Sequence, residues 1–180
     1  MNRINPNVQY VICYDYNRCY FGAAPTLSEI NAAFGKNTAS AWLVPQLYNL
    51  SEYCGCKDKL TGNELKECAQ VIANEYYFLK VSELMLFFYR FKFGKYGRFY
   101  GSVDPMIITT SLQLFLKERD KAYEAKEREE RDEKERESRK GAISWEEYSM
   151  RKYGKVVPSP FARLAQEKEQ QETSENETTK

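Results

Sequence analysis

The sequence contains no histidine, the side chain that most often serves as a general base and as a nitrogen ligand of zinc. Its longest strongly apolar stretch, residues 84–89, is far shorter than the run of about 18 apolar residues that a membrane-spanning helix needs. Phosphate-binding loops, dinucleotide fingerprints and nucleophile elbows are also missing. These absences predict a protein that is no enzyme, uses no cofactor and does not enter a membrane.

The net charge of the chain is only +1, so its overall electrostatics do not indicate a nucleic-acid binder. The five cysteines are an odd number, and residues 1–7 lack the apolar core of a signal peptide. We therefore expect a cytoplasmic protein with free thiols. Cys54, Cys56 and Cys68 do not have the paired spacing of a four-ligand zinc site, and we predict no metal.

Large apolar residues concentrate before residue 116 and become sparse after it. The sequence therefore predicts a mainly α fold with a compact domain of four to five helices. We expect five segments: an extended N-terminal segment at 1–25, a helical domain at 26–116, a protruding charged helix at 117–140, a short amphipathic hook helix at 141–157 and a disordered tail at 158–180.

The apolar residues at 8–13 and 19–21 predict a small N-terminal β-hairpin, with an extended arm packed on helices as the alternative. Apolar periodicity and capping residues such as Thr26 and Asp104 predict helices further along the chain. These helices are expected at about 27–34, from Thr38 or Ser40 to 53, and at 64–78, 83–92 and 106–140, with a short one between 144 and 153.

Residues 117–140 contain ten basic and ten acidic side chains, and their spacing favours pairs between residues i and i+4. After Tyr123 this segment has no apolar seam of the kind that a coiled coil requires. We therefore expect a solvated helix.

The most distinctive segment is residues 87–101, which is rich in aromatic side chains and holds four cations and no acid. Cations neutralise phosphates, aromatic faces stack on unpaired bases, and glycines allow the backbone to approach a ligand closely. The residues that we expect to contact single- or double-stranded DNA are Arg90, Lys92, Lys95, Tyr96 and Arg98. In the alternative interpretation, the aromatic residues form the core and the cations are its solvated edge.

The hook helix offers a second kind of binding site. Trp145, Tyr148 and Met150 give it a small apolar face, and such a helix can dock into a groove of another protein.

Three motifs carry a resemblance to known sequences: WLVPQL at 42–47, EYYFLK at 75–80 and GRFYGSVDP at 97–105. Through them residues 42–119 resemble uncharacterised small proteins of Bacteroidales genomes and mobile elements, a group from which no activity can be transferred. The layout of Glu83, the glycine-rich loop and the helix reaching Arg119 is also similar to the helical domains of phage helicase loaders and replisome organisers. That resemblance implies a small helical domain and a flexible C-terminal tail that engages a replication protein, without an ATPase site.

These observations lead to one hypothesis and one alternative. The chain is expected to be a non-enzymatic, DNA-associated accessory protein of a phage or mobile element, possibly acting in replication. The alternative is an adaptor that binds a protein through its C-terminal helical segment, without nucleic-acid contact. Exposure of Arg90, Lys95 and Arg98 on one face would favour DNA binding, whereas pairing of these cations with acids would favour the adaptor.

Overall fold

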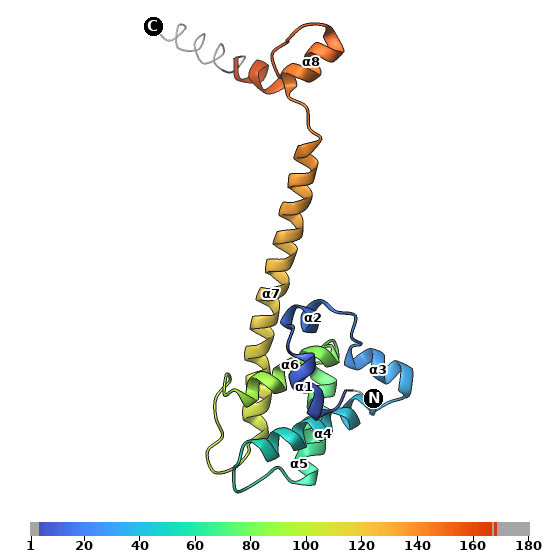
Figure 1. Ribbon diagram of the computed structural model, residues 1–180, viewed down its shortest axis with the longest axis vertical. Coiled ribbons are helices and arrows are strands. Elements are labelled where there is room, and N and C mark those ends of the chain that lie inside the picture. The colour runs from blue at the N-terminus through green and yellow to red at the C-terminus, as the bar shows by residue number, and fades with distance from the viewer. Residues whose placement is uncertain (1–3, 167, 169–180) are drawn as a thin grey trace. The chain divides into compact units, whose positions relative to one another are not determined.

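The computed structural model describes residues 4–166 and residue 168, and the chain divides into two compact units, Met1–Glu127 and Arg128–Lys180. The elements are η1 (Pro6–Val8), α1 (Gln9–Ile12), α2 (Tyr16–Phe21), α3 (Leu27–Phe34), α4 (Thr38–Tyr53), α5 (Gly62–Glu75), α6 (Val81–Lys92), α7 (Pro105–Lys140) and α8 (Trp145–Tyr153) (Figure 1). The predicted mainly α class is confirmed.

The predicted N-terminal β element is wrong. Residues 8–21 form the short helices α1 and α2, and no strand occurs anywhere in the described part of the chain. Asp15 caps α2 because its carboxylate accepts a hydrogen bond from the Arg18 backbone N–H at 3.1 Å. A hairpin here would have no neighbouring strand, whereas helical turns satisfy their own backbone and bury Cys19 and Tyr20. Packing therefore overrides the β propensity of the segment.

The caps predicted at Thr26 and Asp104 are confirmed, whereas the helix predicted from residue 83 begins at Val81 with Lys80 as its N-cap. Thr26 and Glu29 form a reciprocal capping box at the start of α3, and Thr61 forms the same arrangement with Glu64 at the start of α5. The carboxylate of Asp104 accepts a hydrogen bond from the Met106 N–H at 2.7 Å and so caps α7.

Helix α6 is the centre of the first unit. Nine of its twelve residues are buried, and it packs against α1, α2 and α4 (Figure 1). Phe87 and Phe88 are fully buried, and the Phe87 ring meets Phe115 of α7 with centroids 5.7 Å apart. The five consecutive apolar residues 84–88 cover every side of the helix, which explains why this part of α6 is buried on every face rather than along one stripe.

A buried carboxylate joins α6 to α7. Glu83 is completely buried, and its Oε1 accepts a hydrogen bond from the Arg119 Nε at 2.7 Å, with the Tyr123 hydroxyl 3.1 Å away. Its Oε2 accepts a hydrogen bond from the Lys80 backbone N–H at 2.9 Å, which caps α6. Burying a charge is costly unless it is paired and hydrogen-bonded, and Glu83 is both. The compact unit thus extends to Glu127 and includes the first part of the predicted charged segment.

The C-terminal unit is built around α8. The Ser144 hydroxyl caps this helix, and Gly154 ends it in the left-handed conformation with φ of 69°. The Trp145 indole donates to the Val157 carbonyl at 2.6 Å, so the chain folds back on α8. Residues 160–166 are helical, and residues 167 and 169–180 of the predicted tail lie outside the described residues.

None of the helices among residues 4–166 and 168 combines the length and the apolar character needed to cross a membrane.

Replacing Glu83 by glutamine tests its role in holding α7. Glu83→Gln removes the charge that Arg119 needs, and the free energy of unfolding should fall by about 3 kcal/mol. The measurement is urea unfolding. The matched control is Glu67→Gln on the exposed face of α5, which should change stability by less than about 0.5 kcal/mol. A loss below about 1 kcal/mol for Glu83→Gln would show that the carboxylate does not anchor the helix.

Candidate functional site

The aromatic residues of the segment 87–101 divide between core and surface. Phe87, Phe88 and Phe91 lie in the core of α6. Tyr96, which the sequence predicted to stack on bases, is also buried, with its ring stacked on Phe87 at a centroid distance of 5.6 Å. Its burial, together with the nearby Glu118 carboxylate, raises the pKa of the Tyr96 hydroxyl well above its usual value.

Arg90 points into the protein rather than toward solvent. Its Nη1 donates to the Tyr20 hydroxyl at 2.7 Å and to the Glu118 Oε2 at 2.9 Å. Its guanidinium also lies over the Tyr16 ring, 4.6 Å from the centroid. With an exposed side-chain fraction of only 11%, Arg90 acts as a structural cation that joins α6 to α2 and α7.

Lys95 shares the same acid. Its Nζ lies 2.8 Å from the Glu118 Oε2, and the Tyr96 hydroxyl donates to that oxygen at 3.2 Å. One carboxylate oxygen therefore engages Arg90, Lys95 and Tyr96 together, and the positive charge of the segment is partly neutralised within the unit.

The sequence reasoning placed Glu118 in a solvated segment and so missed this role. A signal for it existed, since Glu118 follows the buried Phe115 by three residues and therefore continues the inward face of α7.

Lys92 is held by neutral groups. Its ammonium donates to the Gln9 Oε1 at 2.7 Å and to the Asn49 Oδ1, and it lies over the Tyr53 ring at 5.5 Å. Burial lowers the pKa of the Lys92 ammonium, because no carboxylate offsets the loss of water. Lys92 therefore joins α6 to α1 and α4 and carries a charge without an acidic partner.

Arg98 differs from the other predicted cations because its side chain is exposed and makes no hydrogen bond or ion pair with the described residues. The glycines on either side of the loop, Gly94 and Gly97, have φ of 74° and 113°, which favours glycine. The structure therefore brings Arg90, Lys95 and Tyr96 together around Glu118 and leaves Arg98 apart.

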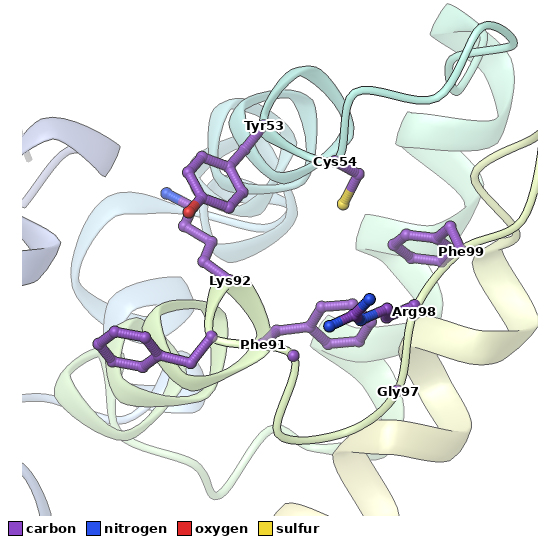
Figure 2. A pocket seen from close by; sticks show the side chains of 9 residues that line it. Tyr53, Cys54, Phe91, Lys92, Gly97, Arg98 and Phe99 are labelled. Carbon is purple, nitrogen blue, oxygen red and sulfur yellow. The ribbon is translucent and has the colours of Figure 1, made fainter.

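Arg98 stands at a pocket of about 250 Å³ beside the loop (Figure 2). The residues around this pocket are Tyr53, Cys54, Phe91, Lys92, Phe93, Gly94, Gly97, Arg98 and Phe99. In Figure 2, Tyr53 and Cys54 come from the end of α4, Phe99 lies opposite Tyr53, and the Lys92 ammonium lies beside the Tyr53 ring. Burial, reinforced by the neighbouring Cys56, raises the pKa of the Cys54 thiol to about 11, so this sulfur is neutral at physiological pH.

The C-terminal unit contains the second predicted site. Trp145 and Tyr148 are half-buried and contact each other, with ring centroids 5.4 Å apart. Of the three predicted partner-binding residues, Met150 alone is exposed. The exposed large apolar side chains of this unit after the start of α8 are Met150, Tyr153, Val156, Phe161 and Leu164.

The fold and these sites describe a helical protein whose basic segment is largely tied into its own core. The chain belongs to the DUF6633 family, a family of unknown function whose sequence profile matches residues 59–156. The match includes α6, the glycine-rich loop, α7 and α8. Neither the curated proteins nor the solved structures contain a match to the chain.

The unequal roles of Arg90 and Arg98 can be tested by stability. Arg90→Met removes two charge-assisted hydrogen bonds, and the free energy of unfolding should fall by about 2–3 kcal/mol. Arg98→Met is the matched control and should change it by less than about 0.5 kcal/mol, because the side chain is exposed and unpaired. Urea unfolding of both variants provides the comparison. Equal losses in the free energy of unfolding would mean that Arg90 stabilises the fold no more than Arg98 does.

Proposed function

We propose that this protein is a non-enzymatic adaptor that binds another protein through its C-terminal unit. The observation that carries the proposal is the set of five exposed apolar side chains defined above, which we call the apolar set. Ile143, just before α8, is a further exposed apolar residue of the same unit. Large apolar side chains left exposed in this number within one small unit are a common mark of protein-interaction sites.

The geometry of the unit supports binding by a preformed element. The Trp145 indole bonds the Val157 carbonyl, and the fully buried Ser149 hydroxyl accepts a hydrogen bond from the Val157 N–H at 3.4 Å. These contacts fix the turn after α8. Met150 and Tyr153 are spaced i, i+3, as are Phe161 and Leu164, so each pair lies on one side of its helix. A fixed turn reduces the entropy that binding must overcome.

The charge around the apolar set indicates the kind of partner. Residues 150–166 contain four cations, Arg151, Lys152, Lys155 and Arg163, and no acid; Arg151 pairs with Glu147 of α8 at 2.9 Å, so the other three carry the excess positive charge. The matching surface is an apolar groove with an acidic rim, since complementary charges raise association rates and select the partner. We propose that this partner is a replication protein of a phage or mobile element, as the sequence resemblance implies.

The DNA-binding hypothesis has less support from the geometry. Arg90 and Lys95 pair with Glu118, Lys92 is held by neutral acceptors, and Tyr96 is buried. Using these cations for phosphates would require breaking contacts that hold α6 and α7 together. Of the three cations named for this comparison, Arg90 and Lys95 are paired with an acid, which favours an adaptor, whereas Arg98 is exposed.

The adaptor proposal predicts that charge introduced into the apolar set weakens binding of the partner. Full-length chain carrying Met150→Asp and Phe161→Asp should bind the partner at least tenfold more weakly, because removing buried anchors of an interface costs about 2 kcal/mol or more each. The partner would be identified by affinity capture and mass spectrometry from cells that encode the chain. It would then be purified, and its dissociation constant measured directly.

The matched control carries Met106→Asp and Phe34→Asp, two exposed apolar residues of the first unit, and should bind like the parent chain. Capture should be unaffected by nuclease treatment. A purified partner that binds the Met150→Asp, Phe161→Asp variant as tightly as the parent would contradict the proposal, as would capture that depends on nucleic acid. Failure to find any protein that binds directly would contradict it too.

A further inference from the structure

The pocket beside the glycine-rich loop has an unusual charge balance, and it is independent of the C-terminal unit. Its nine lining residues include two cations, Lys92 and Arg98, and no carboxylate. Arg98 has a free head group, and the charge of Lys92 is met only by the amide oxygens of Gln9 and Asn49. The thiol of Cys54 is neutral and does not offset them. The pocket therefore favours an anion.

The walls of the pocket favour a flat ring. Four aromatic side chains line it, Tyr53, Phe91, Phe93 and Phe99, and the Phe91 and Phe99 rings are stacked on each other at 5.2 Å. Figure 2 shows Tyr53 and Phe99 on opposite sides of the hollow, with the Arg98 guanidinium between them and nearer the loop. Aromatic faces of this kind bind planar heterocycles by stacking.

We propose that this pocket binds a mononucleotide, with the base against Tyr53 and Phe99 and the phosphate on Arg98. A phosphate monoester carries a charge of about −1.5 to −2 at pH 7. It therefore matches a pocket with two cations and no acid better than a ligand with one carboxylate would. Arginine is also the side chain that matches phosphate with paired N–H donors.

A single nucleotide fits better than a strand. The pocket volume of about 250 Å³ is smaller than that of sites for drug-sized ligands, so it suits one ring system and its phosphate. A strand needs a row of cations along its backbone, but the neighbouring Arg90 and Lys95 are both engaged by Glu118. The ligand is therefore recognised at one base and one phosphate.

The experiment is calorimetric titration of the full-length chain, at low ionic strength, with adenosine 5′-monophosphate. Adenosine and inorganic phosphate serve as half-ligands. The nucleotide should bind with a dissociation constant of about 1 mM or lower, and each half-ligand at least tenfold more weakly. Arg98→Gln and Tyr53→Ala should each weaken nucleotide binding at least tenfold. Arg136→Gln, which changes an exposed arginine of α7, is the matched control and should leave it unchanged.

Alkylation of Cys54 gives a second readout that does not depend on a variant. The nucleotide should slow modification of Cys54 by iodoacetamide at pH 9, as followed by peptide mass spectrometry, because the sulfur lies at the pocket.

Absence of nucleotide binding, or equal binding by Arg98→Gln, would overturn the proposal. A 5′-phosphorylated oligonucleotide that binds more than tenfold tighter than the mononucleotide would overturn it in favour of a strand. These outcomes are separate from partner binding by the C-terminal unit, which the Arg98 and Tyr53 variants leave intact.

Discussion

The first unit depends on the ion pair and hydrogen bonds that the Glu83 carboxylate makes. It is completely buried, it caps α6 through the Lys80 N–H, and it receives the guanidinium of Arg119 from α7. A buried charge that loses its partner costs several kcal/mol, so this arrangement fixes the register of α7 against α6. Glu118, the residue before Arg119, makes a second pair in the opposite sense, with the acid on α7 and the cation, Arg90, about two turns after Glu83 on α6. The two helices are thus locked by two reciprocal charge pairs.

These ion pairs determine which cations of the first unit can contact a ligand. Cations that neutralise Glu118 are not available to a ligand, which leaves Arg98 as the predicted cation with a free head group. It stands at a pocket suited to a small anion, whereas the apolar set belongs to another unit and suits a protein groove.

Local signals in the sequence predicted most of the helices. Thr26 with Glu29, and Asp104 with Pro105, act within one helical turn, so they can be predicted from the sequence alone. The prediction of an N-terminal hairpin was wrong because its β-branched and aromatic residues have no strand to pair with. They pack against other helices instead. Glu118 was missed for a related reason. Its partners, Arg90 and Lys95, lie more than twenty residues away, and a charge between other charges gives no local sign of burial.

The central claim is that the basic segment is structural, and the salt dependence of DNA binding tests it most directly. For single-stranded DNA, the slope of log K against log salt is about −0.7 for each phosphate that a cation neutralises. If only Arg98 is available in the segment, Arg98→Gln should make the slope of the full-length chain shallower by about 0.7, and Arg90→Gln, Lys92→Gln and Lys95→Gln should leave it unchanged. A slope that becomes shallower by about 0.7 in each of the four variants would mean that all four cations meet phosphates and would contradict the account.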